Sequence, residues 1–68
     1  GIAIDPEGNV YVSEPDNNRI SVFDINGNFI TTFGEGQLNF PLGLAVDSDG
    51  KIFAVERNND RIQVFARS

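Results

Sequence analysis

The chain repeats one pattern of turns and apolar strands after 42 residues, and this repeat constrains the fold more than any other feature. The segment 5–23 reads as a turn, an apolar strand, a polar turn, an arginine and a second apolar strand. The segment 47–65 has the same order, with an identical residue at many positions. A repeat of this length indicates a stacked or radial array of similar units, in which each unit buries its apolar surface against its neighbours.

The pattern predicts short β-strands throughout and no helix. Strand-forming apolar residues alternate or run together, and turn-forming Gly, Pro, Asn and Asp separate them; Asn26-Gly27 suits a tight hairpin turn. The predicted strands cover residues 1–5, 9–14, 19–24, 29–33, 42–46, 51–56 and 61–66. They divide the chain into a first unit at 1–41, which includes a connecting loop, and a second, incomplete unit at 42–68.

Two local features predict close contact between the units. Gly1 and Ala3 share one face of the first strand, and small side chains there indicate a position that a neighbour approaches closely. Leu38 and Phe40 are apolar residues within the otherwise polar loop 34–41. We expect both of them to be tucked against the boundary between the units.

Length and composition limit what the chain can do alone. A chain of 68 residues buries little of its surface, and without cysteine or histidine it gains nothing from a disulfide or a zinc site. We therefore expect a partner chain, or more of a longer protein, to supply further burial. The net charge of −5 argues against nucleic acid and acidic membranes as partners. The absence of cysteine favours an extracellular or a thermophilic source only slightly.

The repeated residues closely resemble the NHL repeat. In the first copy the resemblance rests on 1–5, 8–12 and 17–23, and in the second on 43–47, 50–53 and 59–65. The second copy departs from it mildly, with Phe53 where the first has Tyr11, and Asn59-Asp60-Arg61 where the first has Asn17-Asn18-Arg19. The resemblance implies an all-β fold of antiparallel β-propeller blades. One four-stranded blade and three strands of a second are then present, each with its first strand innermost.

This resemblance implies an assembly role for the chain. Too few blades are present to close a ring, and the chain lacks an initiator Met, so we expect an excised, processed or designed piece of a propeller. Its expected partners are other copies of itself, for example three copies forming a six-bladed ring, or the remaining blades; other protein partners are also compatible. The predicted function is a non-enzymatic protein-interaction or structural assembly module. One alternative is part of a ligand-binding or metal-dependent catalytic propeller with an axial site, and another is a filament subunit.

The candidate site residues lie in the turns. Arg19 and Arg61 recur at one repeat position and Asp5 and Asp47 at another, which indicates either a row of ligand contacts or an Asp–Arg pair within each blade. Glu14 and Glu56 recur at the end of the second strand of each unit and are candidates for a surface groove. The loop residues favoured for contacts, with ordinary turn chemistry as the alternative, are Asp16, Asn17, Asn18, Asn58, Asn59 and Asp60.

The residues give little support to a catalytic or a metal-binding function. Ser13 and Ser21 have no histidine to activate them, so no hydrolytic triad is expected. Asp47-Ser48-Asp49-Gly50 resembles the start of a calcium loop, but the rest of such a loop is missing and a hairpin turn is favoured. We expect no catalytic residue, metal ligand or cofactor in this chain.

Overall fold

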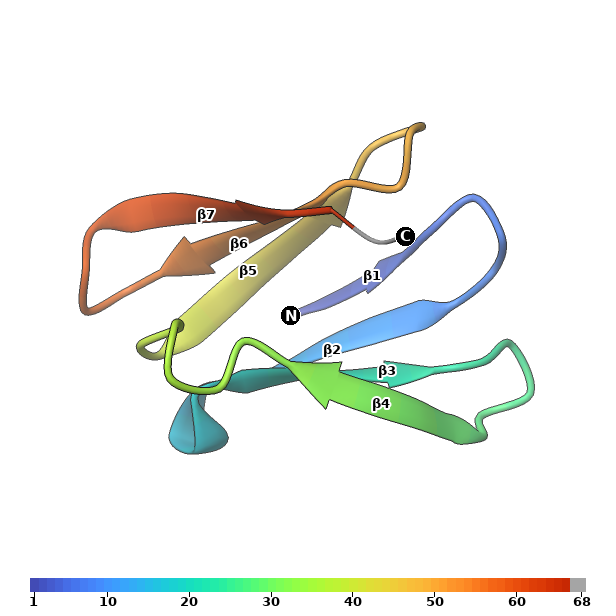
Figure 1. The fold of residues 1–68 in the computed structure, drawn as a ribbon, viewed down its shortest axis with the longest axis horizontal. Coiled ribbons are helices and arrows are strands. Elements are labelled where there is room, and N and C mark those ends of the chain that lie inside the picture. The colour runs from blue at the N-terminus through green and yellow to red at the C-terminus, as the bar shows by residue number, and fades with distance from the viewer. Residues whose placement is uncertain (67–68) are drawn as a thin grey trace.

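A computed structural model describes residues 1–66 of the chain. They form two antiparallel sheets that follow one another along the sequence (Figure 1). The first sheet has the order β1-β2-β3-β4 and the second has the order β5-β6-β7. The strands are β1 (Ile2–Ile4), β2 (Val10–Glu14), β3 (Arg19–Phe23), β4 (Phe29–Phe33), β5 (Pro41–Val46), β6 (Ile52–Glu56) and β7 (Arg61–Phe65). The predicted division into four and three strands is confirmed.

The structure differs from the sequence prediction in small ways. A single 3-10 turn, η1 (Pro15–Asn17), follows β2 where an irregular turn was expected; Pro15 suits its first position because that position needs no N–H donor. Strand β5 begins at Pro41, which was placed in the loop, and the predicted strand at 61–66 ends one residue earlier. The last two residues of the predicted unit 42–68 lie outside the described part of the chain.

The core lies between the two sheets. Six buried side chains form it, with four partly buried ones packed against them: Tyr11, Ile20, Val22, Leu38, Ile52 and Ala54, then Phe33, Leu44, Val46 and Phe65. The rings of Tyr11 and Phe33 lie edge to face at 6.3 Å, and those of Phe33 and Phe65 at 5.1 Å. Such aromatic pairs add to the stabilisation that burial alone provides.

The two sheets meet most closely where β1 and β2 contact β5. A Cβ atom on Gly1 would lie 2.6 Å from the carbonyl oxygen of Leu42, so only glycine fits this approach. The expectation of a small residue at a closely approached position is therefore confirmed for Gly1. Leu38 is buried at the boundary, as predicted, while Phe40 is half-buried.

Each sheet keeps one apolar face turned away from the other sheet. Because side chains alternate along a strand, the strand register assigns every residue to a face. The face of the first sheet that is turned away, its open face, carries Ile2, Ile4, Val10, Val12 and Phe23. The open face of the second sheet carries Ala45, Phe53, Val55, Ile62 and Val64. Several of these side chains are more than half exposed, which is unusual for a core-forming pattern: Ile2, Ile4, Ile62 and Val64.

Candidate interaction site

Aspartate organises the first turn of each unit from within. The carboxylate of Asp5 accepts hydrogen bonds from the backbone N–H groups of Glu7 and Asn9, both at 2.9 Å, and from the Tyr11 hydroxyl at 2.9 Å. Burial raises the pKa of Asp5, but the hydrogen bonds from Asn9, Tyr11 and Glu7 outweigh it and hold the pKa below its usual range. Asp47 accepts the same two backbone bonds, from Asp49 and Lys51.

The arginines bond to glutamate rather than to these aspartates, so the predicted Asp–Arg pairs are wrong. Arg19 lies 3.3 Å from Glu14, and Arg61 lies 2.5 Å from Glu56. The register explains this pairing, because the last residue of the second strand faces the first residue of the third: Glu14 opposite Arg19, and Glu56 opposite Arg61. The aspartates are instead engaged in their own turns, where each accepts backbone N–H groups.

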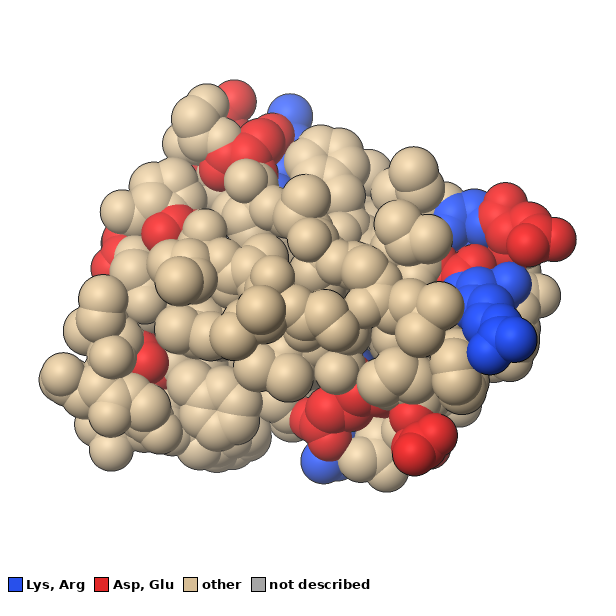
Figure 2. All heavy atoms as spheres, turned by 180° about the vertical axis from the view of Figure 1, so that it is seen from behind, with Lys and Arg blue, Asp and Glu red and all other residues tan. Residues whose placement is uncertain are grey.

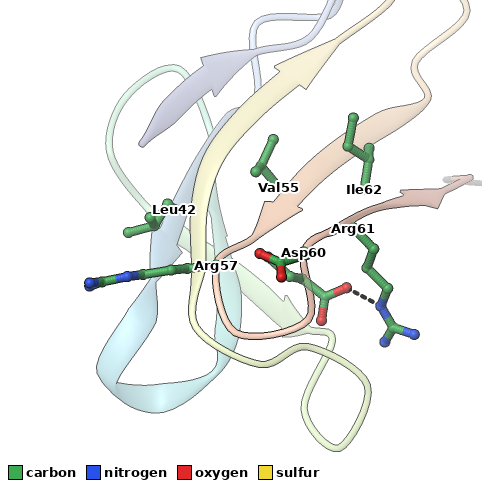
Figure 3. A pocket seen from close by; sticks show the side chains of 7 residues that line it. Leu42, Val55, Arg57, Asp60, Arg61 and Ile62 are labelled. Carbon is green, nitrogen blue, oxygen red and sulfur yellow. Dashed lines mark hydrogen bonds and ion pairs between the residues drawn. The ribbon is translucent and has the colours of Figure 1, made fainter.

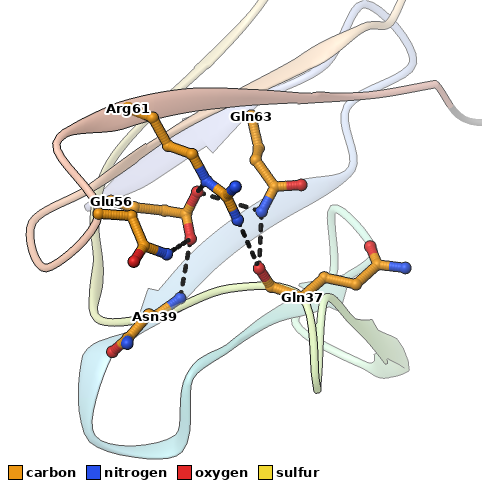
Figure 4. A network of polar contacts seen from close by, with 6 residues as sticks. Gln37, Asn39, Glu56, Arg61 and Gln63 are labelled. Atoms are coloured by element: carbon orange, nitrogen blue, oxygen red, sulfur yellow. Dashed lines mark hydrogen bonds and ion pairs between the residues drawn. The ribbon is translucent and has the colours of Figure 1, made fainter.

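The Glu56 cluster consists of Glu56, Asn59, Arg61 and Gln63; Figure 4 labels Glu56, Arg61 and Gln63. The carboxylate of Glu56 accepts hydrogen bonds from Arg61 at 2.5 Å, Asn59 at 3.0 Å and Gln63 at 3.1 Å. It is almost fully buried, so these donors supply the compensation that a buried charge requires. The hydrogen bond from Arg61 dominates, and with the other donors it outweighs burial and lowers the pKa of Glu56 to about 2.

The Glu14 cluster consists of Glu14, Asn17, Arg19 and Ser21 and is its counterpart in the first sheet. Asn17 donates to Glu14 at 2.8 Å, Arg19 donates at 3.3 and 3.4 Å, and the Ser21 hydroxyl also donates. The hydrogen bonds from Ser21, Asn17 and Arg19 lower the pKa of Glu14 to about 2. The Glu14 side chain keeps a quarter of its surface exposed, whereas that of Glu56 keeps none.

The difference in exposure arises from the connector, residues 34–40, which lies over the Glu56 cluster. The backbone N–H of Asn39 donates to Glu56 at 2.9 Å. The carbonyl of Gln37 accepts from Gln63 at 2.7 Å and from Arg61 at 3.2 Å. These contacts are drawn in Figure 4. Within residues 1–66, no comparable segment is hydrogen-bonded to the Glu14 cluster.

Most of the loop residues proposed for contacts hold the connector or the clusters. The side-chain oxygen of Asn18 accepts from the N–H of Phe40 at 2.8 Å, and Asn58 donates to Asn39 at 3.0 Å. Asn17 and Asn59 donate to the two glutamates. Asp16 and Asp60 are exposed. Asn18 and Asp60 both adopt the left-handed backbone conformation at one repeat position, which Asn and Asp tolerate well.

A hollow of about 350 Å³ opens at the polar end of the second sheet's open face (Figure 3). We call it the Asp60 hollow; its lining comprises Leu42, Val55, Glu56, Arg57, Asp60, Arg61 and Ile62. The sequence had indicated Glu56 and Asp60 as candidates, but not the apolar wall of Leu42, Val55 and Ile62, which lies beside them only because the polar turn after β6 meets strand β7 there.

Uncharged surface dominates the broad middle of one side of the molecule, and charged side chains gather at its ends and rim (Figure 2). Among residues 1–66 no group of three or more His, Cys, Asp or Glu side chains is placed to hold a metal ion. No helix in that part of the chain is long and apolar enough to span a membrane. The arrangement offers apolar faces and backbone-binding polar clusters, which suit contacts with other polypeptide segments.

Comparison with known protein families agrees with this architecture. The model of the NHL repeat matches residues 1–23 and 38–65, which contain strands from both sheets and both glutamate clusters. A search of curated proteins finds no match to the chain. The family match covers most of the sequence, with one matched range for β1–β3 of the first sheet and one for β5–β7 of the second. The chain therefore belongs to the NHL repeat family, and its sheets are blades of the β-propeller type.

Proposed function

We propose that the chain is a non-enzymatic module for protein interaction and structural assembly. In this proposal its two open faces pair with further blades, either in other copies of itself or in the rest of a longer propeller. The observation that carries the proposal is that each open face is the repeat counterpart of a face already buried in the core.

The correspondence follows from the 42-residue repeat. The open face of the first sheet matches the buried face of the second sheet at every position: Ile2 with Leu44, Ile4 with Val46, Val10 with Ile52, Val12 with Ala54, and Phe23 with Phe65. The open face of the second sheet matches the buried face of the first: Ala45 with Ala3, Phe53 with Tyr11, Ile62 with Ile20, and Val64 with Val22. Each of these pairs keeps its apolar character, while the remaining residue of that face, Val55, corresponds to the polar Ser13.

One chain thus carries both halves of an interface that already exists inside it. The open face of the second sheet in one copy is complementary to the open face of the first sheet in the next copy. Such a contact is head-to-tail, and it yields a closed ring if the rotation closes and an open filament if it does not. The apolar surface buried by association also compensates for the small core of a chain of this length.

The absence of histidine from the sequence and the structural engagement of the recurrent Asp, Glu and Arg residues support a non-enzymatic role. These groups bond to backbone and to one another in both repeats. A catalytic centre is usually assembled once, from different residues on different elements.

Sedimentation velocity over a dilution series tests the assembly. The expected result is concentration-dependent association that Ile62→Lys or Ile4→Lys abolishes, because each places a charge on an open face. Ile25→Lys is the matched control, since Ile25 is an exposed apolar residue in the turn between β3 and β4. A chain that stays monomeric at every concentration and unfolds cooperatively would contradict the proposal.

A further inference from the structure

We propose that Gly43 is the point on the open face of the second sheet against which strand β1 of a second copy of the chain lies. Gly43 is an interior residue of β5, the first strand of that sheet. The contact rests on the proposed assembly and defines the two strands, β5 of one copy and β1 of the next, whose backbones meet in it.

Nothing in the packing of the chain itself requires a glycine at position 43. A glycine inside a strand has no side chain to pack and costs conformational entropy, and it often marks a place where another backbone approaches closely. A Cβ atom on Gly43 would lie 3.7 Å from Cγ2 of Val55 and 3.8 Å from its Cβ, which are ordinary van der Waals distances. The backbone of Gly43 does not have positive φ, unlike that of the turn and connector glycines Gly8, Gly27, Gly34, Gly36 and Gly50.

Gly1 shows what this repeat position meets when a neighbouring blade is in place. It precedes Gly43 by one repeat of 42 residues. A Cβ atom on Gly1 would lie 2.6 Å from the carbonyl oxygen of Leu42, 3.2 Å from the nitrogen of Leu44 and 3.3 Å from Cα of Gly43. All three are backbone atoms of β5, so they cannot move aside as the end of a flexible side chain can. Glycine at this position therefore permits the backbone of the adjacent blade to approach.

Head-to-tail association places Gly43 in the same relation to a second copy. The register sets Gly43 opposite Val55, and both lie on the open face of the second sheet. At the proposed junction, β5 of one copy takes the place of β1, and β1 of the next copy takes the place of β5. The residues of that copy that correspond to Gly43 and Leu44 are Gly1 and Ile2. Their backbone then lies against Gly43 as the backbone of β5 lies against Gly1.

Strand β1 of a second copy also has the side chains that this contact needs. Ile2 and Ile4 are 67% and 62% exposed, and they are the repeat counterparts of Leu44 and Val46. Leu44 and Val46 pack against the core between the two sheets. The same strand therefore offers a closely approaching backbone and two apolar side chains, in the arrangement that already joins β1 to β5 within the chain.

Alanine at the two repeat positions should have opposite effects. Gly1→Ala should lower the midpoint of urea denaturation, because its Cβ atom meets β5 of its own chain. Gly43→Ala should not lower it, because alanine fits there and restricts the unfolded chain. In sedimentation velocity, Gly43→Ala should weaken association about tenfold and Gly43→Val should abolish it. Ser48→Thr, which adds one carbon in an exposed turn of the same sheet, should change neither measurement.

A mixture of two variants tests the direction of the contact. Gly43→Val leaves the open face of the first sheet unaltered, and Ile4→Lys leaves the open face of the second sheet unaltered. Each variant alone should sediment as a monomer. An equimolar mixture should form a heterodimer, in which the intact second sheet of the Ile4→Lys chain holds β1 of the Gly43→Val chain. A general loss of structure would not be rescued in this way.

The unaltered chain tests the same contact by NMR, which serves if the Gly43 variants do not fold. Over a dilution series, the backbone amide signals of Gly43 and Ile2 should shift together with the change in sedimentation, and that of Ser48 should stay constant. Shifts that leave Gly43 and Ile2 unaffected while the chain associates would place the junction elsewhere and overturn the contact.

The outcomes separate this contact from the assembly itself. A folded Gly43→Val chain that associates like the parent overturns the contact and leaves the assembly standing. A Gly43→Ala chain that loses as much stability as Gly1→Ala shows that the glycine serves its own chain, which also overturns the contact. A mixture of folded Gly43→Val and Ile4→Lys chains that stays monomeric does the same. A parent chain that never associates overturns both the contact and the proposed function.

Discussion

Gly34→Ala should destabilise the chain more than Gly36→Ala, because only Gly34 lies against a buried side chain. Both glycines have positive φ angles, 88° and 81°. A Cβ atom on Gly34 would lie 2.4 Å from Cδ1 of Leu38, whereas one on Gly36 would have no neighbour within 4 Å. Gly36→Ala therefore isolates the backbone strain, and Gly34→Ala adds the displacement of Leu38.

The magnitudes follow from these two contributions. An alanine with positive φ costs about 1–2 kcal/mol, and the smaller entropy of its unfolded chain returns about 0.4–1 kcal/mol. Leu38 is buried, and full burial of a leucine contributes about 1.5–3 kcal/mol, of which a shifted side chain loses part. The free energy of unfolding should therefore fall by about 1 kcal/mol in Gly36→Ala and by about 2–3 kcal/mol in Gly34→Ala.

Urea denaturation followed by the fluorescence of the single tyrosine, Tyr11, measures both values. All chains are compared at one concentration, because association contributes to apparent stability. In a Leu38→Ala background the excess cost of Gly34→Ala should fall below about 0.5 kcal/mol, since the contact is gone. An equal cost for the two glycines, or an excess that survives removal of Leu38, would refute the reasoning.

Two further predictions concern the hydrogen-bonded carboxylates Asp5, Glu14 and Glu56. Tyr11→Phe copies the Phe53 of the second repeat and removes the hydrogen bond from the Tyr11 hydroxyl to Asp5. It should lower the free energy of unfolding by about 1–2 kcal/mol and raise the pKa of Asp5. Urea denaturation followed by circular dichroism, because the tyrosine is lost, and an NMR pH titration would detect both, whereas an unchanged pKa of Asp5 would show that the hydroxyl is unimportant. The pKa values of Glu14 and Glu56 are lowered from 4.5 to about 2, so the stabilisation that they provide is complete above pH 4.5 and is lost as pH falls toward 2. Urea midpoints that stay constant between pH 5 and 2.5 would contradict this sign.

The strands and their division into two sheets were accessible from the sequence because the strand pattern depends on local chemistry. Apolar alternation and turn residues recur in both copies, and each copy supports the interpretation of the other. The burial of Leu38 was also predictable, since an apolar residue stood alone within a polar loop. The left-handed conformation of Phe40 had no such signal, because an aromatic residue rarely adopts it and only its bonds to both sheets explain it.

The partners of the charged residues could not be read from composition or spacing alone. Asp5 and Arg19 recur together, but so do Glu14 and Arg19, and only the antiparallel register places the glutamate opposite the arginine. A register argument applied to the predicted turn between the two strands would have found this pair. The full burial of Glu56 depends on the connector, whose path the sequence does not determine.

Comparison of the two repeats separates the positions that pack the sheets together from those that bond the linking backbone. Most positions that pack sheet against sheet stay apolar in both copies, the exception being Ser13, which corresponds to Val55. Three of the changes fall on side chains that bond the backbone of residues 37–42 or lie at the matching place: Ser13 and Val55, Asn18 and Asp60, and Ser21 and Gln63. The connector is therefore held at these points through its backbone. Packing of apolar side chains therefore joins the two sheets, and these few polar positions hold the backbone that links them.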